Sequence, residues 1–240
     1  MNSIENREFC LSDQFLKDSE LVALKTKSNF TASYLSLNVS INQTAEFFSY
    51  IKSERRKFSK FEPEILELYK NGSLHFTLGA AVQLLNDPNA ENIKKIVEPQ
   101  KEDILKIVRE EISKIKPFKV AAKFTKATEQ SIFVFCSFEK EMEKTIENFQ
   151  NNIVERIYKV LEDTGVEKYT GNKPFGRPVN FARWNVTKLP EDVKGFFEHY
   201  TKSFTEEIKT EGKVRKAVLT YSDQSWSNPE RDTIRTFELK

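Results

Sequence analysis

The chain has 240 residues, an apolar fraction of 38% and a formal net charge of +2 from 38 basic and 36 acidic residues. This length fits one large domain or two small lobes with a real hydrophobic core. The nearly balanced charge argues against a strong electrostatic field over the whole molecule that would attract nucleic acid or a membrane. It does not exclude a local basic groove.

The two cysteines, Cys10 and Cys136, match no disulfide framework and no metal-ligand spacing. The first 20 residues carry charges throughout, without the apolar stretch of a secretory signal. No segment reaches the roughly 18 apolar residues of a membrane span. We therefore expect a cytoplasmic protein that needs no metal and no other cofactor and makes no contact with a membrane.

Residues 1–30 are polar and weakly patterned, so we treat them as an N-terminal extension that is partly helical. The first clear pattern is the strict alternation of polar and apolar residues from Tyr34 to Ile41, which is typical of a half-buried strand. A helix capped by Asn42 or Thr44 should follow, and its basic end suits the negative end of the helix dipole. The pattern of residues 61–69 fits a helix and a loop equally well.

A second strand is expected after the Asn71-Gly72 turn, and it contains His75-Phe76-Thr77-Leu78. Successive side chains of a strand point to opposite faces, so His75 and Thr77 share one face. Leu74, Phe76 and Leu78 then lie on the other face and pack in the core. One face thus carries an imidazole beside a hydroxyl, which together can hold a phosphate and move a proton.

The rest of the chain mixes helices and strands without regular alternation, which predicts an α+β fold rather than a doubly wound sheet. The remaining expected elements are, in chain order, a helix over about 90–115 broken near Pro99, strands over 118–124 and 131–138, a helix over 141–161, a loop over 165–177, a strand over 179–186, a helix from Pro190 toward Lys209, and strands over 214–221 and 233–239.

This order of elements, together with the His75-Phe76-Thr77-Leu78 motif, resembles the 2H phosphoesterase superfamily, which contains the LigT-like (2′-5′ RNA ligase-like) proteins and the RNA cyclic phosphodiesterases. The resemblance covers about residues 33–240 and includes the Pro117-Phe118 entry into a strand pair. It implies a bilobal fold in which two pseudo-symmetric lobes of antiparallel sheet with flanking helices surround a central cleft. Residues 31–240 would then form a single bilobal domain.

Proteins of this superfamily carry one His-x-Thr/Ser motif in each lobe. One histidine acts as general base and the other as general acid on a phosphodiester, and the hydroxyls hold the phosphate without a metal. The resemblance therefore makes His75 and Thr77 the candidate catalytic residues. It implies a monomer whose partner is an RNA end or a nucleotide with a phosphodiester.

The second motif departs from the pattern of the superfamily. Aligned on Ala182-Arg183-Trp184, the second histidine position is occupied by Pro178 and the second hydroxyl position by Asn180. The chain's other histidine, His199, lies in a segment of helical pattern, where positions two apart do not share a face. The second lobe is thus predicted to lack its titratable group.

Further candidates for ligand binding surround these positions. Asn180 can donate a hydrogen bond to a phosphate oxygen, and Arg177 can supply a cation, although each can equally be structural or solvated. Tyr34 and Trp226 are candidates for stacking a base, with core packing as the alternative. Arg183 lies three residues after Asn180, so an ideal strand would place it on the opposite face.

Two functions follow from the resemblance. The first is a metal-independent phosphodiesterase acting on RNA ends or on 2′,3′-cyclic or 2′-5′-linked nucleotides, with weak or altered activity. Loss of one partner in general acid–base catalysis typically costs about 10²–10⁴-fold. The alternative is a catalytically inactive module that binds a nucleotide, an RNA end or a protein partner. If the resemblance were a coincidence of element order, His75 would instead be sealed in the core.

Overall fold

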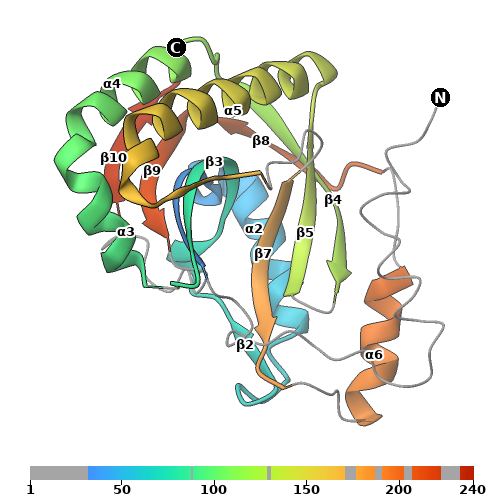
Figure 1. Cartoon of the computed structure of the whole chain (residues 1–240). Helices are drawn as coiled ribbons and strands as arrows, with labels where there is room; N and C mark the ends of the chain where they lie inside the picture. Colours follow the sequence, from blue (N-terminus) through green and yellow to red (C-terminus); the bar gives the residue numbers. More distant parts are fainter. Residues whose placement is uncertain are drawn as a thin grey trace.

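The computed structural model describes residues 32–87, 89–128, 131–170, 177–186, 191–202, 207–222 and 233–240 (Figure 1). The expectations for residues 1–30 and for Trp226 lie outside the described residues. The described chain forms two five-stranded antiparallel sheets with helices packed against them. Within it, no helix is long and apolar enough to cross a membrane.

The first sheet, called sheet A, has the strand order β10-β9-β1-β3-β6. Three helices cover one of its faces, with α3 against β1 and β9, α5 against β3, and α4 against α5. The elements are β1 (Ala32–Ser40), β3 (His75–Leu85), α3 (Ala90–Val97), α4 (Lys101–Ile112), α5 (Lys140–Leu161), β6 (Glu167–Lys168), β9 (Lys216–Ser222) and β10 (Thr233–Glu238).

The second sheet, called sheet B, has the strand order β2-β7-β5-β4-β8 and is covered on one face by α2 and α6. Thr125 on β4 donates a hydrogen bond to Glu54 on α2, and Trp184 on β7 packs against Phe197 on α6. The elements are α2 (Ala45–Lys57), β2 (Leu66–Leu68), β4 (Phe118–Ala127), β5 (Ser131–Phe138), β7 (Arg177–Trp184), α6 (Glu191–Lys202) and β8 (Thr210–Val214).

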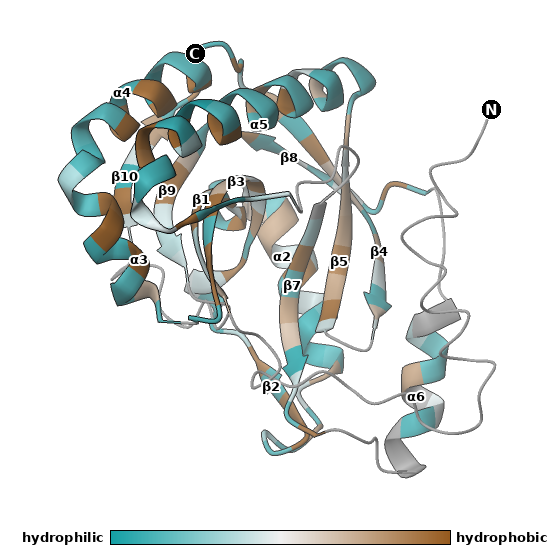
Figure 2. Ribbon diagram, viewed as in Figure 1, coloured by the Kyte–Doolittle hydropathy of each residue, from teal (hydrophilic) through white to brown (hydrophobic). Residues whose placement is uncertain are grey.

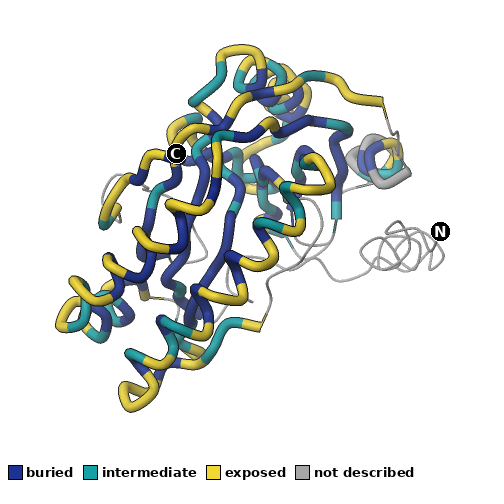
Figure 3. The backbone as a smooth tube through the Cα atoms, turned by 90° about the horizontal axis from the view of Figure 1, so that it is seen from above, coloured by how far each residue is buried: buried dark blue, intermediate teal, exposed yellow. Residues whose placement is uncertain are grey.

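The helix-covered faces of both sheets join in one hydrophobic core. Phe76 on β3 lies 5.6 Å from Phe138 on β5 between ring centroids, and Phe138 in turn meets Phe118 at 5.4 Å. Buried residues of both sheets therefore form a continuous interior (Figure 3), and the helices turn apolar residues toward it (Figure 2). The opposite face of each sheet is covered by none of the helices among the described residues, and it is called the helix-free face of that sheet.

The predicted α+β class is confirmed, as are the helix break near Pro99 and the pair of strands β4 and β5. The expected strand over 214–221 is confirmed as β9, which begins at Lys216, whereas β8, which ends at Val214 and belongs to sheet B, was not expected. β8 has the sequence Thr-Glu-Gly-Lys-Val, whose polar residues and glycine give little strand signal. The short strand β2 lies in segment 61–69, for which a helix and a loop were both left open. The short strand β6 lies in segment 165–177, which was expected to be a loop throughout.

The edge strand β8 passes close to the start of α2, and Gly212 makes this approach possible. A Cβ atom at position 212 would collide with Thr44 Oγ1 and lie 3.0 Å from Phe47 Cβ. We expect Gly212→Ala to lower the free energy of unfolding by about 1–3 kcal/mol, the usual cost of overpacking. Urea unfolding followed by circular dichroism measures this change.

The matched control is Gly72→Ala, because a Cβ at the exposed Gly72 would meet nothing within 4 Å. This variant should stay within about 0.5 kcal/mol of the wild type. Equal unfolding midpoints for the two variants would contradict the close contact between β8 and α2.

Candidate functional site

His75 and Thr77 both lie half-exposed on β3. Leu74, Phe76 and Leu78 are at most 1% exposed, as the alternation of a strand predicts. His75 as a whole residue thus keeps part of its surface exposed. The imidazole and the hydroxyl share the helix-free face of sheet A.

A β-bulge separates the motif from the rest of its strand. Leu37 on β1 pairs with Gly79, whereas Asn38 pairs with Thr77, so Leu78 is an extra residue in the ladder. Gly79 faces α5, where a Cβ would lie 3.1 Å from Gln150. The Gln150 side-chain amide donates to the Leu78 carbonyl at 2.6 Å. The bulge thus turns Thr77 away from α5, onto the face that carries Asn38.

A row of buried polar side chains continues this face across β1 and β9. Asn38 Nδ2 donates to Ser36 Oγ at 3.0 Å and to Thr220 Oγ1 at 2.8 Å, and Ser36 Oγ lies 2.8 Å from Ser222 Oγ. Each side chain in the row holds the next, so the surface beside Thr77 is fixed before any ligand arrives. Sequence reasoning missed this row, although Ser36 and Asn38 occupy alternate positions of the first strand.

Two effects set the protonation state of His75. Its Nδ1 lies 2.6 Å from the Ser73 carbonyl oxygen, which can only accept, so the neutral ring carries its proton on Nδ1. Burial lowers the pKa of His75 to about 4, although the hydrogen bond to Ser73 opposes this shift. At neutral pH the ring is uncharged and its Nε2 carries a lone pair that can accept a proton, although a pKa of about 4 makes it a weak base.

Strand β7 of sheet B lies next to β3 of sheet A. It carries the two positions at which the second motif was expected, with Pro178 exposed and Asn180 half-buried. Ser131 Oγ donates to Asn180 Oδ1 at 2.8 Å, which orients the amide nitrogen of Asn180 as a donor for another group. In the register of β5 and β7, Asn180 pairs with Phe133.

The expected orientation of Arg183 is wrong. A register shift between Ile132 and Phe133 pairs Asn180 with Phe133 but Arg183 with Ser131. Phe133 and Ser131 are two apart on β5 and share a face, so Asn180 and Arg183 share the helix-free face as well. The bulge around Phe181 thus brings a half-buried guanidinium to the strand that neighbours His75.

The remaining sequence candidates fall in different places. Tyr34 is half-buried on β1, with its ring 5.5 Å from that of Tyr169. Arg177 begins β7, but its side chain lies outside the described part of the chain. Trp184 is 1% exposed and donates its indole hydrogen to the Thr128 carbonyl, so it is a core residue.

His199 is exposed on helix α6, which covers the core side of sheet B. The helical pattern predicted for this segment is confirmed. His199 therefore forms no second strand motif.

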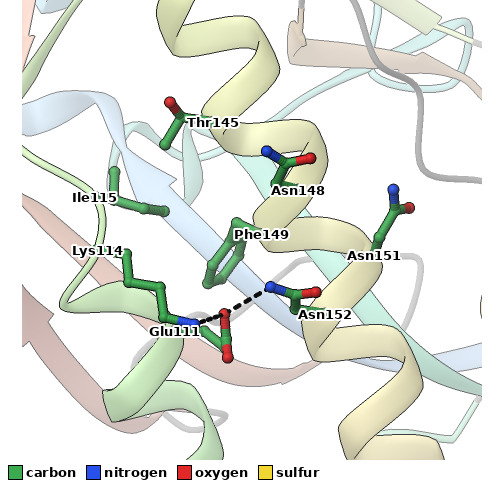
Figure 4. Close-up of a pocket in the computed structure, with 8 residues that line it drawn as sticks. All are labelled: Glu111, Lys114, Ile115, Thr145, Asn148, Phe149, Asn151 and Asn152. Atoms are coloured by element: carbon green, nitrogen blue, oxygen red, sulfur yellow. Dashed lines mark hydrogen bonds and ion pairs between the residues drawn. The ribbon is translucent and has the colours of Figure 1, made fainter.

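A pocket of about 480 Å³ lies elsewhere, between α4 and α5 (Figure 4). It contains none of the candidate residues, because it belongs to the helix side of sheet A. Its lining residues are Glu111, Lys114, Ile115, Thr145, Asn148, Phe149, Asn151 and Asn152. Across the described ranges, no three His, Cys, Asp or Glu residues gather in a way that could hold a metal ion.

Comparison with known proteins identifies the fold. No protein-family model matches the chain, and no curated protein matches it in sequence. Among solved structures, TT0787 of Thermus thermophilus matches with a TM-score of 0.53 and 15% identity, over 86% of this chain and 97% of that one. At this identity the similarity shows the fold alone.

Two further similar structures are those of Escherichia coli LigT. The complex with 3′-AMP has a TM-score of 0.49 and 11% identity over 87% of this chain and 99% of that one. The complex with NADP+ has a TM-score of 0.48 and 11% identity over 87% and 98%.

The chain has the bilobal α+β fold of the 2H phosphoesterases, which confirms the fold class expected from the sequence.

The protonation state of His75 can be tested directly, because the chain has only two histidines. In a proton NMR titration, the His75 ring signal should change with a midpoint near pH 4, and the His199→Gln variant assigns it. Nitrogen chemical shifts should show the Nδ1-protonated tautomer at pH 7. A midpoint at or above the ordinary value of about 6.5 would contradict the burial of this ring.

Proposed function

We propose that the helix-free face around His75 and Thr77 binds the phosphodiester of an RNA end, or of a 2′,3′-cyclic or 2′-5′-linked nucleotide, and that the chain is a metal-independent phosphodiesterase of weak or altered activity. One observation carries this proposal: His75 and Thr77 share an accessible face next to the strand that presents Asn180 and Arg183. We also propose that the protein is a monomer in the cytoplasm and that it works without a cofactor.

Each group has a chemical role in this reaction. The Thr77 hydroxyl and the Asn180 amide nitrogen donate hydrogen bonds to phosphate oxygens, and the Arg183 guanidinium offsets their charge. His75 Nε2 takes a proton from water as the new P–O bond forms. One ribose ester P–O bond breaks, and the released oxygen takes a proton from solvent or from the imidazolium.

Pro178 favours a second candidate function. Proline can neither donate nor accept a side-chain proton, and it stands where the superfamily carries its second histidine. If no other group protonates the leaving oxygen, the chain is an inactive module that binds the nucleotide or RNA end and releases it unchanged.

Hydrolysis of 2′,3′-cyclic AMP, followed by phosphorus NMR, distinguishes the two functions. We expect slow hydrolysis by the wild type and a loss of about 10²-fold or more in His75→Ala, the usual contribution of a general base. The rate should be independent of pH above about 5, because the pKa of His75 is lowered to about 4 and the free base already dominates. His199→Ala is the matched control and should keep the wild-type rate.

Binding without hydrolysis in the wild type would favour the inactive module. If the wild type neither binds nor hydrolyses any phosphodiester, the proposed function is wrong.

The role of Arg183 is tested by Arg183→Gln, with the exposed Arg56→Gln on α2 as control. We expect Arg183→Gln to weaken the binding of 2′,3′-cyclic AMP by about 10-fold or more, because charge-assisted hydrogen bonds contribute about 1.5–3 kcal/mol. Titration calorimetry measures both variants after their melting temperatures have been compared. Equal dissociation constants for the two variants would remove Arg183 from the site.

A further inference from the structure

A short turn carries the chain from sheet B into sheet A and leads directly to His75. β2 belongs to sheet B and β3 to sheet A, and the 3-10 turn η4 (Asn71–Ser73) lies between them. Before the turn, the Tyr69 backbone nitrogen donates to the Phe181 carbonyl on β7 at 2.9 Å. After it, the Ser73 carbonyl accepts from Nδ1 of His75 at 2.6 Å. The shape of this turn therefore sets where the imidazole lies relative to β7.

Hydrogen bonds rather than packing hold the turn in shape. The backbone nitrogen and the hydroxyl of Ser73 both donate to the Lys70 carbonyl, at 3.0 and 2.8 Å. The Leu74 nitrogen donates to the Asn71 carbonyl at 3.4 Å. A Cβ atom at Gly72 would meet nothing within 4 Å, so packing contributes little at the tip of the turn. A contact from outside is needed to fix the turn against the body of the protein.

Arg55 supplies this contact from the last turn of α2. Its Nη1 donates to Asn71 Oδ1 at 2.9 Å. Burial lowers the pKa of Arg55, but a guanidinium stays charged at neutral pH, so the bond to Asn71 is charge-assisted.

The placement of this guanidinium is costly. Nε of Arg55 is buried and has no hydrogen-bond partner among the described residues. An unpaired buried N–H costs free energy, and proteins retain such costs chiefly at functional sites. Stability alone therefore gives little reason to keep a cation at this position.

We infer that Arg55 is a positioning residue for His75 and acts through Asn71 and the turn η4. The inference rests on the proposed function, since the placement of the ring affects a rate only if His75 is the base. The guanidinium holds Asn71, and the turn then presents the Ser73 carbonyl to the ring. A hydrogen bond to one ring nitrogen decides which nitrogen carries the proton, so this carbonyl keeps Nε2 free to accept one.

The first test reads the His75 ring in the full-length protein without any ligand. Arg55→Met keeps the aliphatic stem and removes the donors, Asn71→Ala removes the acceptor, and Asn71→Asp keeps an acceptor oxygen for the guanidinium. Nitrogen NMR at pH 7 should show less of the Nδ1-protonated tautomer in Arg55→Met and in Asn71→Ala, and the wild-type tautomer in Asn71→Asp. The double variant Arg55→Met/Asn71→Ala should go no further than either single variant, because both remove the same bond.

The second test measures hydrolysis of 2′,3′-cyclic AMP. The kcat of Arg55→Met should fall by about 10- to 100-fold, because a shift of about 1 Å in a reacting group can cost about 100-fold. The KM should stay close to that of the wild type, since the groups proposed to bind the phosphate are unchanged. Asn71→Asp should keep most of the wild-type kcat.

Arg56→Met is the matched control, because Arg56 is the next residue on α2 and is exposed. It should change neither the tautomer nor kcat. All variants are compared below their melting temperatures. If Arg55→Met lowers the melting temperature but keeps the wild-type tautomer and kcat, Arg55 is only structural, so the inference fails and the proposed function stands.

If the wild type hydrolyses no phosphodiester, the proposed function fails as a catalytic one, and the tautomer of His75 then decides the inference by itself. Loss of the Nδ1-protonated tautomer in Arg55→Met, but not in Arg56→Met, would support the positioning of the ring by Arg55. An unchanged tautomer in Arg55→Met would overturn it.

Discussion

The convergence of two sheets on one core is the constraint on which the proposed site depends. Phe76 on β3 and Phe138 on β5 belong to different sheets, yet their rings are in contact beneath the sheet faces. Burying the rings of Phe76 and Phe118 contributes on the order of 1.5–3 kcal/mol per side chain, and the partly buried ring of Phe138 contributes less. Because side chains alternate along each strand, His75 lies on the helix-free face of sheet A and Phe135 on that of sheet B.

Local alternation allowed much of this arrangement to be predicted. The pattern of β1 and the placement of His75 and Thr77 opposite Phe76 follow from a period of two residues, which any single strand obeys. The break near Pro99 follows from the missing backbone hydrogen of proline. The helical pattern around His199 likewise excluded it as a second motif.

The bulges could not be predicted, because each depends on the register between two strands that are distant in sequence. Arg183 lies on the same face as Asn180 only because β7 has one extra residue relative to β5. No sequence pattern in the segment around Arg183 indicates this register shift. The partial exposure of Phe135 was missed for a related reason. The run from Ile132 to Cys136 is apolar throughout, so it gave no sign that Phe135 is half-exposed while Val134 is buried.

Pro178 has a consequence for the backbone that is separate from its missing side-chain chemistry. Proline has no backbone hydrogen to donate, and it stands on the strand where sheet B borders sheet A. β3 and β7 belong to separate hydrogen-bonded sheets, so side-chain packing holds this border and no ladder crosses it. The packing of Phe76 against Phe138 therefore takes the place of backbone hydrogen bonds in setting the angle between the two sheets.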